Sequence, residues 1–362
     1  MNEAEKPVGL ELPERMMPDT NPVALRHAML RRANLFLGVT HHAHFLAIPS
    51  LAPHYADILA SHFAAIGRDF SEPEIALLTQ HLATEMLRAH ALSPHGKIRV
   101  SFETEAPPGR GVRYEIVALP CSLEDQYRSW VETRPPPLFG AQADRIVLEL
   151  ASALVPAGSA PVLDVGAGTG RNSLALARLG HPVDALEVSE ALTAVMLEDM
   201  EREGLDLRVL RADVLAADTK LPAGRYALTV VSQVVSHFRS VADLRLLLER
   251  LAASSATGGR VVLNVFLATR GYEPSAMAVE VSQTMWSSLF TYPQLHAALE
   301  GLPFALVADE LVYDYERARF PEGQWPPTGW YEPWILGLDI FALNSRSSPV
   351  EFHWLVLERR AG

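Results

Sequence analysis

The sequence contains a single cysteine, Cys121, among its 362 residues. An internal disulfide and a zinc site with several cysteine ligands are therefore excluded, and a reducing compartment is expected. No motif around Cys121 marks it as a nucleophile, so a small buried side chain is the favoured interpretation.

Positive charge is scarce as well. The chain has 31 Lys and Arg against 43 Asp and Glu, which gives a formal net charge of −12. Because binding to nucleic acid relies on clustered Lys and Arg, we expect no nucleic-acid partner. The one notable basic cluster, Arg26, Arg31 and Arg32, is expected to form a solvated helix face.

Long hydrophobic runs are absent. No stretch reaches the roughly 18 uninterrupted apolar residues of a membrane span. The N-terminus carries Glu3 and Glu5, where a secretory signal would have basic residues. We therefore expect a cytoplasmic protein without a membrane partner, and the balance of 49% hydrophobic and 20% charged residues is typical of a globular chain.

The length of the chain predicts about two domains. Residues 1–121 are expected to form an N-terminal, mainly helical domain with a β-hairpin, preceded by a polar tail over residues 1–20. Ser71 and Glu74 form a capping box that marks the start of its longest helix. The expected helices are Pro22–Leu37, Leu51–Ile66 and Glu72–Leu92, and the expected hairpin strands are Lys97–Glu103 and Val112–Leu119.

From residue 122 to residue 362 the pattern changes to alternating strands and helices, which is typical of an α/β fold with a doubly wound parallel sheet. Expected strands are 162–165, 183–188, 207–214, 227–233, 260–267, 305–315 and 351–358. Expected helices are 126–131, 142–154, 171–179, 190–203, 241–253 and 292–299. No internal repeat is visible.

The segment 161–170, Pro-Val-Leu-Asp-Val-Gly-Ala-Gly-Thr-Gly, joins a buried strand to a helix through three glycines. Glycine accepts positive φ and allows backbone N–H groups to approach a ligand. Gly166, Gly168 and Gly170 form G-x-G-x-G, whereas dinucleotide-binding turns have G-x-G-x-x-G. The spacing therefore disfavours a nicotinamide oxidoreductase, which we keep only as a third hypothesis behind the two stated at the end of this section.

Two acidic residues make the turn more specific. Glu187 ends the second strand of this region, where a carboxylate can accept both hydroxyls of a ribose. Asp213 ends the third strand, where it can accept a hydrogen bond from an adenine amino group. Because ligands bind outside the carboxyl ends of parallel strands, the turn and both acids are expected to converge.

With these residues in view, the segment from Val162 to Leu267 resembles the class I S-adenosylmethionine-dependent methyltransferases. The run 162–173, with Arg-Asn-Ser after the glycines, is similar to the tellurite-resistance-like branch of that family. The resemblance implies a Rossmann-like, seven-stranded sheet with an antiparallel last strand, and it covers roughly residues 125–362. Residues 1–120 match no family that we recognise.

The resemblance also implies a set of cofactor-binding residues. S-adenosylmethionine would lie over the glycine turn and be released as S-adenosylhomocysteine. The set comprises Asp164, Gly166, Gly168, Gly170, Glu187 at the ribose, Asp213 and Val214 at the adenine, and Gln233 near the methionine part. Asp213 is equally a good helix N-cap, and Gln233 could satisfy backbone groups at a strand end.

His237 is the candidate catalytic residue. It lies just after the fourth strand, in a loop that faces the methyl group in the fold that the resemblance implies. A histidine can accept a proton near neutral pH, so it could act as general base. The alternative is that it only holds the loop or the cofactor.

Aromatic residues supply the candidate substrate pocket. A segment near residues 316–349 holds several of them among prolines, which suggests a semi-rigid lid, although packing on the N-terminal domain explains it equally well. The pocket candidates are Tyr127, Trp130, Trp325, Trp330, Tyr331 and Trp334. His41 and His44 could share a helical face, but no acid accompanies them, so no metal site is expected.

These observations lead to one principal hypothesis. The chain is a methyltransferase (EC 2.1.1.-) that acts on an oxygen or nitrogen of a small-molecule or peptide-derived substrate. The alternative is a cofactor-binding scaffold without turnover. A homodimer through the N-terminal domain is a further expectation, and the substrate itself is not predicted.

Overall fold

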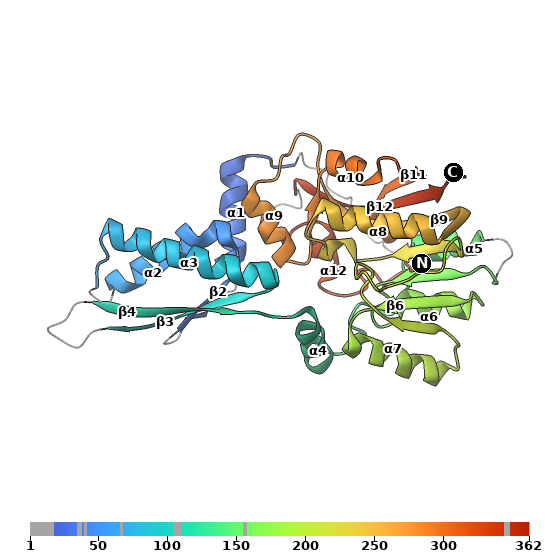
Figure 1. The fold of residues 1–362 in the computed structure, drawn as a ribbon, viewed down its shortest axis with the longest axis horizontal. Helices are drawn as coiled ribbons and strands as arrows, with labels where there is room; N and C mark the ends of the chain where they lie inside the picture. Colours follow the sequence, from blue (N-terminus) through green and yellow to red (C-terminus); the bar gives the residue numbers. More distant parts are fainter. Residues whose placement is uncertain are drawn as a thin grey trace, which may run out of the picture.

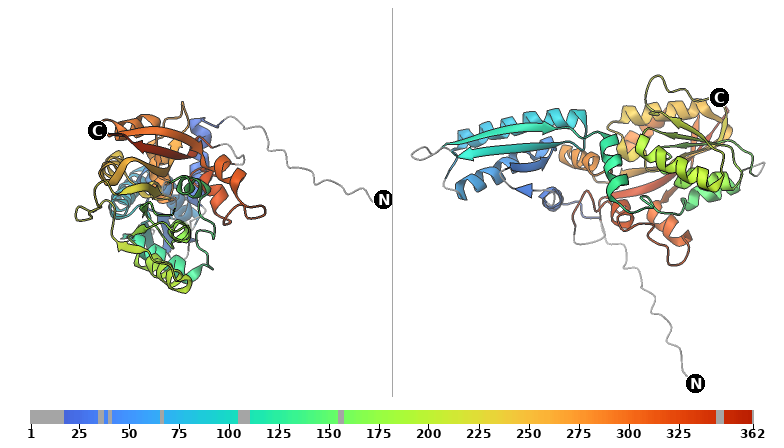
Figure 2. Two further views of the ribbon diagram at one scale, coloured as in Figure 1. Left: turned by 90° about the vertical axis from the view of Figure 1, so that its right-hand side faces the viewer. Right: turned by 90° about the horizontal axis from the view of Figure 1, so that it is seen from below.

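The computed structural model describes residues 18–34, 38–39, 42–65, 68–104, 111–154, 158–343 and 348–361. Two parts are evident in Figure 1. We call the described residues from 18 to 119 the arm, and those from 123 to 361 the body. The arm extends away from the large sheet of the body, as the right-hand view of Figure 2 shows.

The arm is a four-stranded antiparallel sheet with helices packed on one face. Its strands follow the order β1-β2-β3-β4. The capping box predicted at Ser71 and Glu74 is present at the start of α3. The elements are α1 (Pro22–Asn34), β1 (Gly38–Val39), β2 (His42–Leu46), η1 (Pro49–Leu51), α2 (Ala52–Ala65), α3 (Glu72–Leu92), β3 (Lys97–Thr104) and β4 (Val112–Leu119).

Two predictions for the arm need correction. His42 and His44 lie on strand β2, so they do not lie on a helix, because the alternation of exposed and buried positions in this segment is that of a strand. The first helix ends at Asn34, within the expected range, and residues 35–37 lie outside the described residues. His41 and Ile66 also lie outside them. The hairpin was predicted, but its two additional strands were not.

The body is built on a sheet of strand order β11-β12-β9-β8-β5-β6-β7, with β10 pairing on β9. Strand β12 is antiparallel to both neighbours, and the other pairings in the sheet are parallel, which confirms the predicted α/β architecture. The strands are β5 (Val162–Val165), β6 (Val183–Glu187), β7 (Arg208–Arg211), β8 (Tyr226–Val231), β9 (Ser255–Ala268), β10 (Leu289–Phe290), β11 (Phe304–Leu311) and β12 (Val350–Arg359).

Helices cover both faces of this sheet (Figure 1). Side chains of α5 and α6 join one buried cluster with Val162 and Trp354, and side chains of α8 and α10 join another with Leu163 and Leu355. The helices are α4 (Leu123–Thr133), α5 (Arg145–Ser152), α6 (Arg171–Arg178), α7 (Glu190–Glu203), η2 (Val235–His237), α8 (Val241–Ser254), α9 (Ala276–Thr284), α10 (Tyr292–Leu299), α11 (Val312–Arg319) and α12 (Tyr331–Ile335).

Several boundaries in the body differ from the prediction. The strand expected over 305–315 ends at Leu311, and helix α11 follows, in which Glu316 faces the core. The strand expected over 207–214 is only four residues long, and the helix expected from Gln142 begins at Arg145. In the part of the chain that is described, no helix is both long and apolar enough to cross a membrane.

The arm is fixed to the body by polar contacts around the end of α3. Arg239 donates to the carbonyl oxygens of His90 (2.7 Å) and Ala91 (3.0 Å). Glu280 of α9 accepts a hydrogen bond from the Ser50 N–H at 2.8 Å. The buried cluster of the arm is also continuous with the α5 face of the sheet. The end of the arm therefore lies at the carboxyl ends of the strands.

Candidate active site

A cavity of about 670 Å³ lies where the carboxyl ends of the strands face the arm. Its wall is formed by the loops after β5, β6, β7 and β8, by helix α4, by the turn between α3 and β3, and by residues 284–286 and 330–339. Segments from the arm and the body thus enclose one space.

The glycine turn forms the base of the cavity at the end of β5. Gly166 and Gly168 line it, with φ of +68° and +57°. A Cβ on Gly166 would lie 2.3 Å from Cγ2 of Val234, so no larger residue fits there. Gly170 does not line the cavity; it is the N-cap of α6, and a Cβ there would lie 2.8 Å from Cγ of Met196.

Glu187 is buried at the end of β6, and its carboxylate faces backbone donors. It accepts hydrogen bonds from the N–H of Gly168 at 2.7 Å and of Val188 and Ser189 at 2.8 Å. Burial raises the pKa of Glu187, and these hydrogen bonds counteract the rise. The carboxylate also lines the cavity, so it can accept ligand hydroxyls.

Asp213 and Val214 line the cavity beyond β7. The carboxylate of Asp213 accepts a hydrogen bond from the N–H of Leu215 at 2.8 Å. This is a turn contact, and no described helix begins at Asp213, so the alternative of an ordinary helix N-cap is not what the structure contains. The side chain of Asp213 remains exposed to the cavity region.

Gln233 follows β8 in a left-handed conformation, with φ of +63°. Its N–H donates to Oδ1 of Asn264 at 2.7 Å. Its side-chain Nε2 is buried and has no hydrogen-bond partner among the described residues. A buried donor without a partner is costly, and an L-residue in this conformation is strained, so both features indicate a ligand-binding position.

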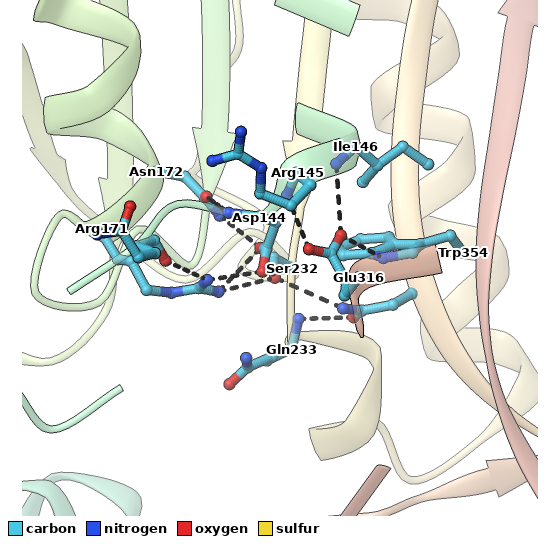
Figure 3. A network of polar contacts seen from close by, with 11 residues as sticks. Asp144, Arg145, Ile146, Arg171, Asn172, Ser232, Gln233, Glu316 and Trp354 are labelled. Atoms are coloured by element: carbon cyan, nitrogen blue, oxygen red, sulfur yellow. Dashed lines mark hydrogen bonds and ion pairs between the residues drawn. The ribbon is translucent and has the colours of Figure 1, made fainter. Parts of the chain in front are cut away.

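Beneath these residues lies a buried ionic network centred on Asp144 (Figure 3). Arg171 forms a bidentate pair with Asp144 at 2.6 and 2.8 Å. Asn172 and Ser232 donate to the same carboxylate at 2.9 and 2.7 Å. The network ties the start of α6 to the end of β8 and to the segment before α5. In the sequence, the only local signal for this network is the Arg-Asn-Ser run that follows the glycines.

Glu316 extends this network at the start of α5. Its carboxylate accepts from the N–H groups of Arg145 at 2.8 Å and Ile146 at 3.3 Å, and from the indole of Trp354 at 3.1 Å. Burial and the nearby Asp144 raise the pKa of Glu316 to about 7. Near the glycine turn, burial likewise raises the pKa of Asp164 to about 7, while Ser173 donates to it at 2.6 Å.

Helix α4 closes one side of the cavity. Glu124 accepts hydrogen bonds from the N–H groups of Glu190 and Ala191, at 3.1 and 3.2 Å, and so ties α4 to the start of α7. Tyr127 and Trp130 of α4, two of the expected pocket residues, both line the cavity, and their role in binding a substrate stays a prediction. Their rings are 5.4 Å apart in an edge-to-face arrangement.

Trp286 lies at the centre of the aromatic wall, and sequence analysis missed it. It has a φ of +60°. Its ring stacks on His95 of the arm at 3.7 Å and lies 4.8 Å from Trp130. Its carbonyl oxygen accepts from the indole of Trp334 at 3.0 Å. No local pattern marks Trp286, because its contacts come from three distant segments.

His237 lies on η2 in the wall of the cavity, beside Trp286. Its Nε2 is 3.2 Å from the hydroxyl of Tyr127. Burial, reinforced by the nearby His95, lowers the pKa of His237 to about 3. The imidazole is therefore neutral at neutral pH and only weakly basic.

The aromatic insertion divides between the cavity and the core. Trp330 and Trp334 line the cavity, whereas Trp325 and Tyr331 do not. Tyr331 is 2% exposed and belongs to the buried cluster that covers one face of the sheet. The insertion is thus a packed part of the body, and it contacts the arm through an ion pair of 2.9 Å between Asp339 and Arg32.

Comparison with known proteins agrees with this geometry. A family model described as "Methyltransferase domain" matches residues 162–259. The chain is 32% identical over 136 residues to the ubiquinone biosynthesis O-methyltransferase of Xanthomonas axonopodis pv. citri (strain 306). That match covers 37% of this chain and 53% of the relative, so the chain spans about half the length of that relative.

Solved structures are similar at low sequence identity. The [4+2]-cyclase SpnF is 15% identical, with 66% of this chain and 96% of that chain covered and a TM-score of 0.48. The geranyl diphosphate C-methyltransferase of Streptomyces coelicolor A3(2) is 14% identical, with 59% and 77% covered and a TM-score of 0.45. The similarity of the turn to the tellurite-resistance-like branch stays a prediction.

The family match spans the strands and loops that carry the glycine turn, Glu187, Asp213 and Gln233. The last strand, β12, is antiparallel to both of its neighbours, as the resemblance predicted. Residues 162–259 are therefore similar to the class I S-adenosylmethionine-dependent methyltransferases, and these matches support S-adenosylmethionine as the cofactor.

Proposed function

We propose that this chain is an S-adenosylmethionine-dependent methyltransferase that methylates an oxygen or nitrogen of a small-molecule or peptide-derived substrate. One observation carries the proposal. The glycine turn and Glu187 line the same cavity as the aromatic wall of Trp130 and Trp286. A nucleoside-type site and an acceptor-type surface therefore share one space, as methyl transfer requires.

The cofactor residues are assigned by their place in the cavity. Gly166 and Gly168 allow the backbone to approach the ligand, and Glu187 would accept the ribose hydroxyls. Asp213 and Val214 lie where the adenine would bind. Asp164 and Gln233 would lie at the methionine part, where the unpartnered Nε2 of Gln233 offers a donor. Gly170 acts indirectly, by allowing α6 to start.

The cofactor supplies a methyl group on a sulfonium, and the chain has to align the acceptor and exclude water. The aromatic wall and α4 would serve both tasks, because their side chains enclose the part of the cavity beside Gln233. An acceptor there would be held in place and shielded from water. His237 is neutral and could accept a proton, but its lowered pKa makes it a weak base. We therefore favour an acceptor atom that needs little help from a base.

The domain boundary is proposed at residues 121–122, between β4 and α4. The 1–121 domain would complete the acceptor side of the cavity through His95 and Lys97. A homodimer through the arm and a cytoplasmic location also belong to this proposal. The edge strand β4, which pairs only with β3 among the described residues, is the surface that supports a dimer.

Titration calorimetry with S-adenosylmethionine tests the cofactor site. Glu187→Ala and Glu187→Gln should weaken binding at least about a hundredfold, because two charge-assisted hydrogen bonds are lost. Glu190→Gln is the control, since Glu190 is exposed and does not line the cavity. Wild-type binding that is absent, or is unchanged in both Glu187 variants, contradicts the proposal.

Turnover is tested separately. A cell extract is incubated with the chain and methyl-labelled S-adenosylmethionine, and labelled products are sought by mass spectrometry. A product labelled on oxygen or nitrogen supports methyl transfer. Tight binding of the cofactor with no labelled product in any extract fraction favours the scaffold alternative instead.

A further inference from the structure

Charges are distributed unevenly along the cavity. Glu187 and Asp213 lie at the ends of β6 and β7. Two basic residues line the same cavity, Lys97 at the start of β3 and Arg134 at the end of α4. Neither forms an ion pair with a described residue.

The other basic residues of the cavity wall are neutralised. Arg171 is paired with Asp144 at 2.6 Å, and Arg32 with Asp339 at 2.9 Å. His95 and His237 do not add positive charge at neutral pH, because burial lowers the pKa of His95 to about 4 and that of His237 to about 3. The uncompensated charge on the acceptor side is therefore that of Lys97 and Arg134.

Arg134 is held beside the aromatic wall. Its guanidinium lies 4.2 Å from the centre of the Trp130 ring, one helical turn earlier on α4. Partial burial lowers the pKa of Arg134, yet a guanidinium stays protonated in proteins. A planar guanidinium stacked on a ring keeps its N–H groups in one plane, which suits a carboxylate.

The neighbouring rings offer flat apolar surface. Trp130 and Trp286 lie 4.8 Å apart with their planes tilted by 48°. The ring of His95 stacks in parallel on that of Trp286 and supports it. Such a rigid aromatic surface favours a planar ligand, since stacking adds to the burial of apolar area.

Building on the proposed function, we propose that the acceptor substrate is a planar aromatic anion. Its ring lies against Trp130 and Trp286, and its anionic group is bound by Arg134, with Lys97 adding positive potential at the mouth. A neutral analogue would forgo both interactions.

The test measures binding of matched probes to the protein saturated with S-adenosylhomocysteine, by calorimetry. The probes are 2-naphthoate, its neutral amide 2-naphthamide, and the cation 2-naphthylmethylamine. We expect 2-naphthoate to bind at least about tenfold more tightly than the amide, as one charge-assisted hydrogen bond provides. Arg134→Gln should abolish that preference and leave S-adenosylhomocysteine affinity unchanged.

Lys220→Gln is the matched control, because Lys220 is exposed and lies outside the cavity wall. It should keep the full preference, and Lys97→Gln should reduce it by less than Arg134→Gln does. The proposal is overturned by equal binding of acid and amide, by preference for the cation, by absence of binding of all three probes, or by an unchanged preference in Arg134→Gln. Binding of S-adenosylhomocysteine to the wild type is measured first. If the wild type does not bind it, the proposed function is rejected, and not this inference alone.

Discussion

The two ends of the cavity are built in different ways. The strand end consists of short loops that follow successive strands, and its charged groups neutralise one another below the surface, as Asp144 and Arg171 do. The arm end is assembled from segments far apart in the chain. There, the rings of His95 and Trp130 each contact the ring of Trp286.

Because of this difference, the structure of each end of the cavity depends on different interactions. The strand end is held by a buried ionic network within the sheet and its helices, so it is preorganised before any ligand binds. The arm end exists only while the arm, α4 and the insertion are docked together. Changes at the strand end should therefore alter global stability and cofactor binding, whereas changes at the arm end should alter the acceptor surface.

Removal of Asp144 should have the largest effect. In Asp144→Ala the Arg171 side chain, which is 9% exposed, would keep a buried charge without its carboxylate. Breaking a buried pair in this way destabilises a protein by about 3–5 kcal/mol. Urea denaturation of the purified variant measures the loss in the free energy of unfolding.

A surface pair provides the control for Asp144. Asp199→Ala removes an exposed partner of Arg202 and should change the stability by less than about 1 kcal/mol. The double variant Asp144→Ala/Arg171→Met should regain part of the lost stability, since no buried charge remains. If Asp144→Ala costs no more than Asp199→Ala, the network does not hold the strand end together.

Most of the strand end could be predicted from the sequence because its signals are local. The glycine turn, Glu187 and Asp213 each lie at or just after the end of a strand, and the antiparallel last strand follows from the family resemblance. The network below was not predictable in the same way. Asp144 and Glu316 are 172 residues apart and meet only because α11 packs on α5, where a strand had been expected.

The arm end was predicted only in part. Tyr127 and Trp130 are conspicuous on one short helix, and Trp330 and Trp334 stand out in a proline-rich segment. Trp286 and His95 carry no local signal, because their role comes from tertiary contacts between the arm and the body. Strand β2 was missed since it is short and its partner, β3, lies about fifty residues later.

The dependence of stability on pH should differ between the two ends. Glu316, beneath the strand end, has a folded pKa of about 7 against an ordinary value of 4.5. The folded state therefore binds more protons than the unfolded state between these values. The contribution of Glu316 to stability is fully present below about pH 4.5 and is lost as the pH rises through 7. The loss attributable to Glu316 is about 3 kcal/mol.

His95, at the arm end, should act in the opposite direction. Its folded pKa of about 4 lies below the ordinary 6.5, so the unfolded state binds more protons between these values. Stability should therefore rise by about 3 kcal/mol from pH 4 to pH 6.5. Urea denaturation of the wild type, Glu316→Gln and His95→Gln between pH 4 and pH 7 separates the two contributions. A slope that is no smaller in its own variant than in the wild type contradicts the assignment, since Asp164 and His237 add slopes of the same sign.

The smallest effect is expected from Arg239, which fixes the arm to the body. Arg239→Ala removes two hydrogen bonds to the last carbonyl groups of α3. Since these bonds are partly exposed, we expect a loss of only about 1–2 kcal/mol in the free energy of unfolding. The consequence for the cavity should be local, because the ring of His95 would no longer be held against Trp286.

Tryptophan fluorescence and calorimetry check this selectivity. Arg239→Ala should change the tryptophan emission and leave the affinity for S-adenosylhomocysteine within about twofold of the wild type. Arg245→Ala is the matched control, because Arg245 likewise donates to backbone carbonyls, those of Ala298 and Glu300, but within the body. A variant of Arg239 that loses cofactor affinity along with the aromatic contact would show that the two ends of the cavity are coupled. In that case the arm would belong to the cofactor site as well as to the acceptor surface.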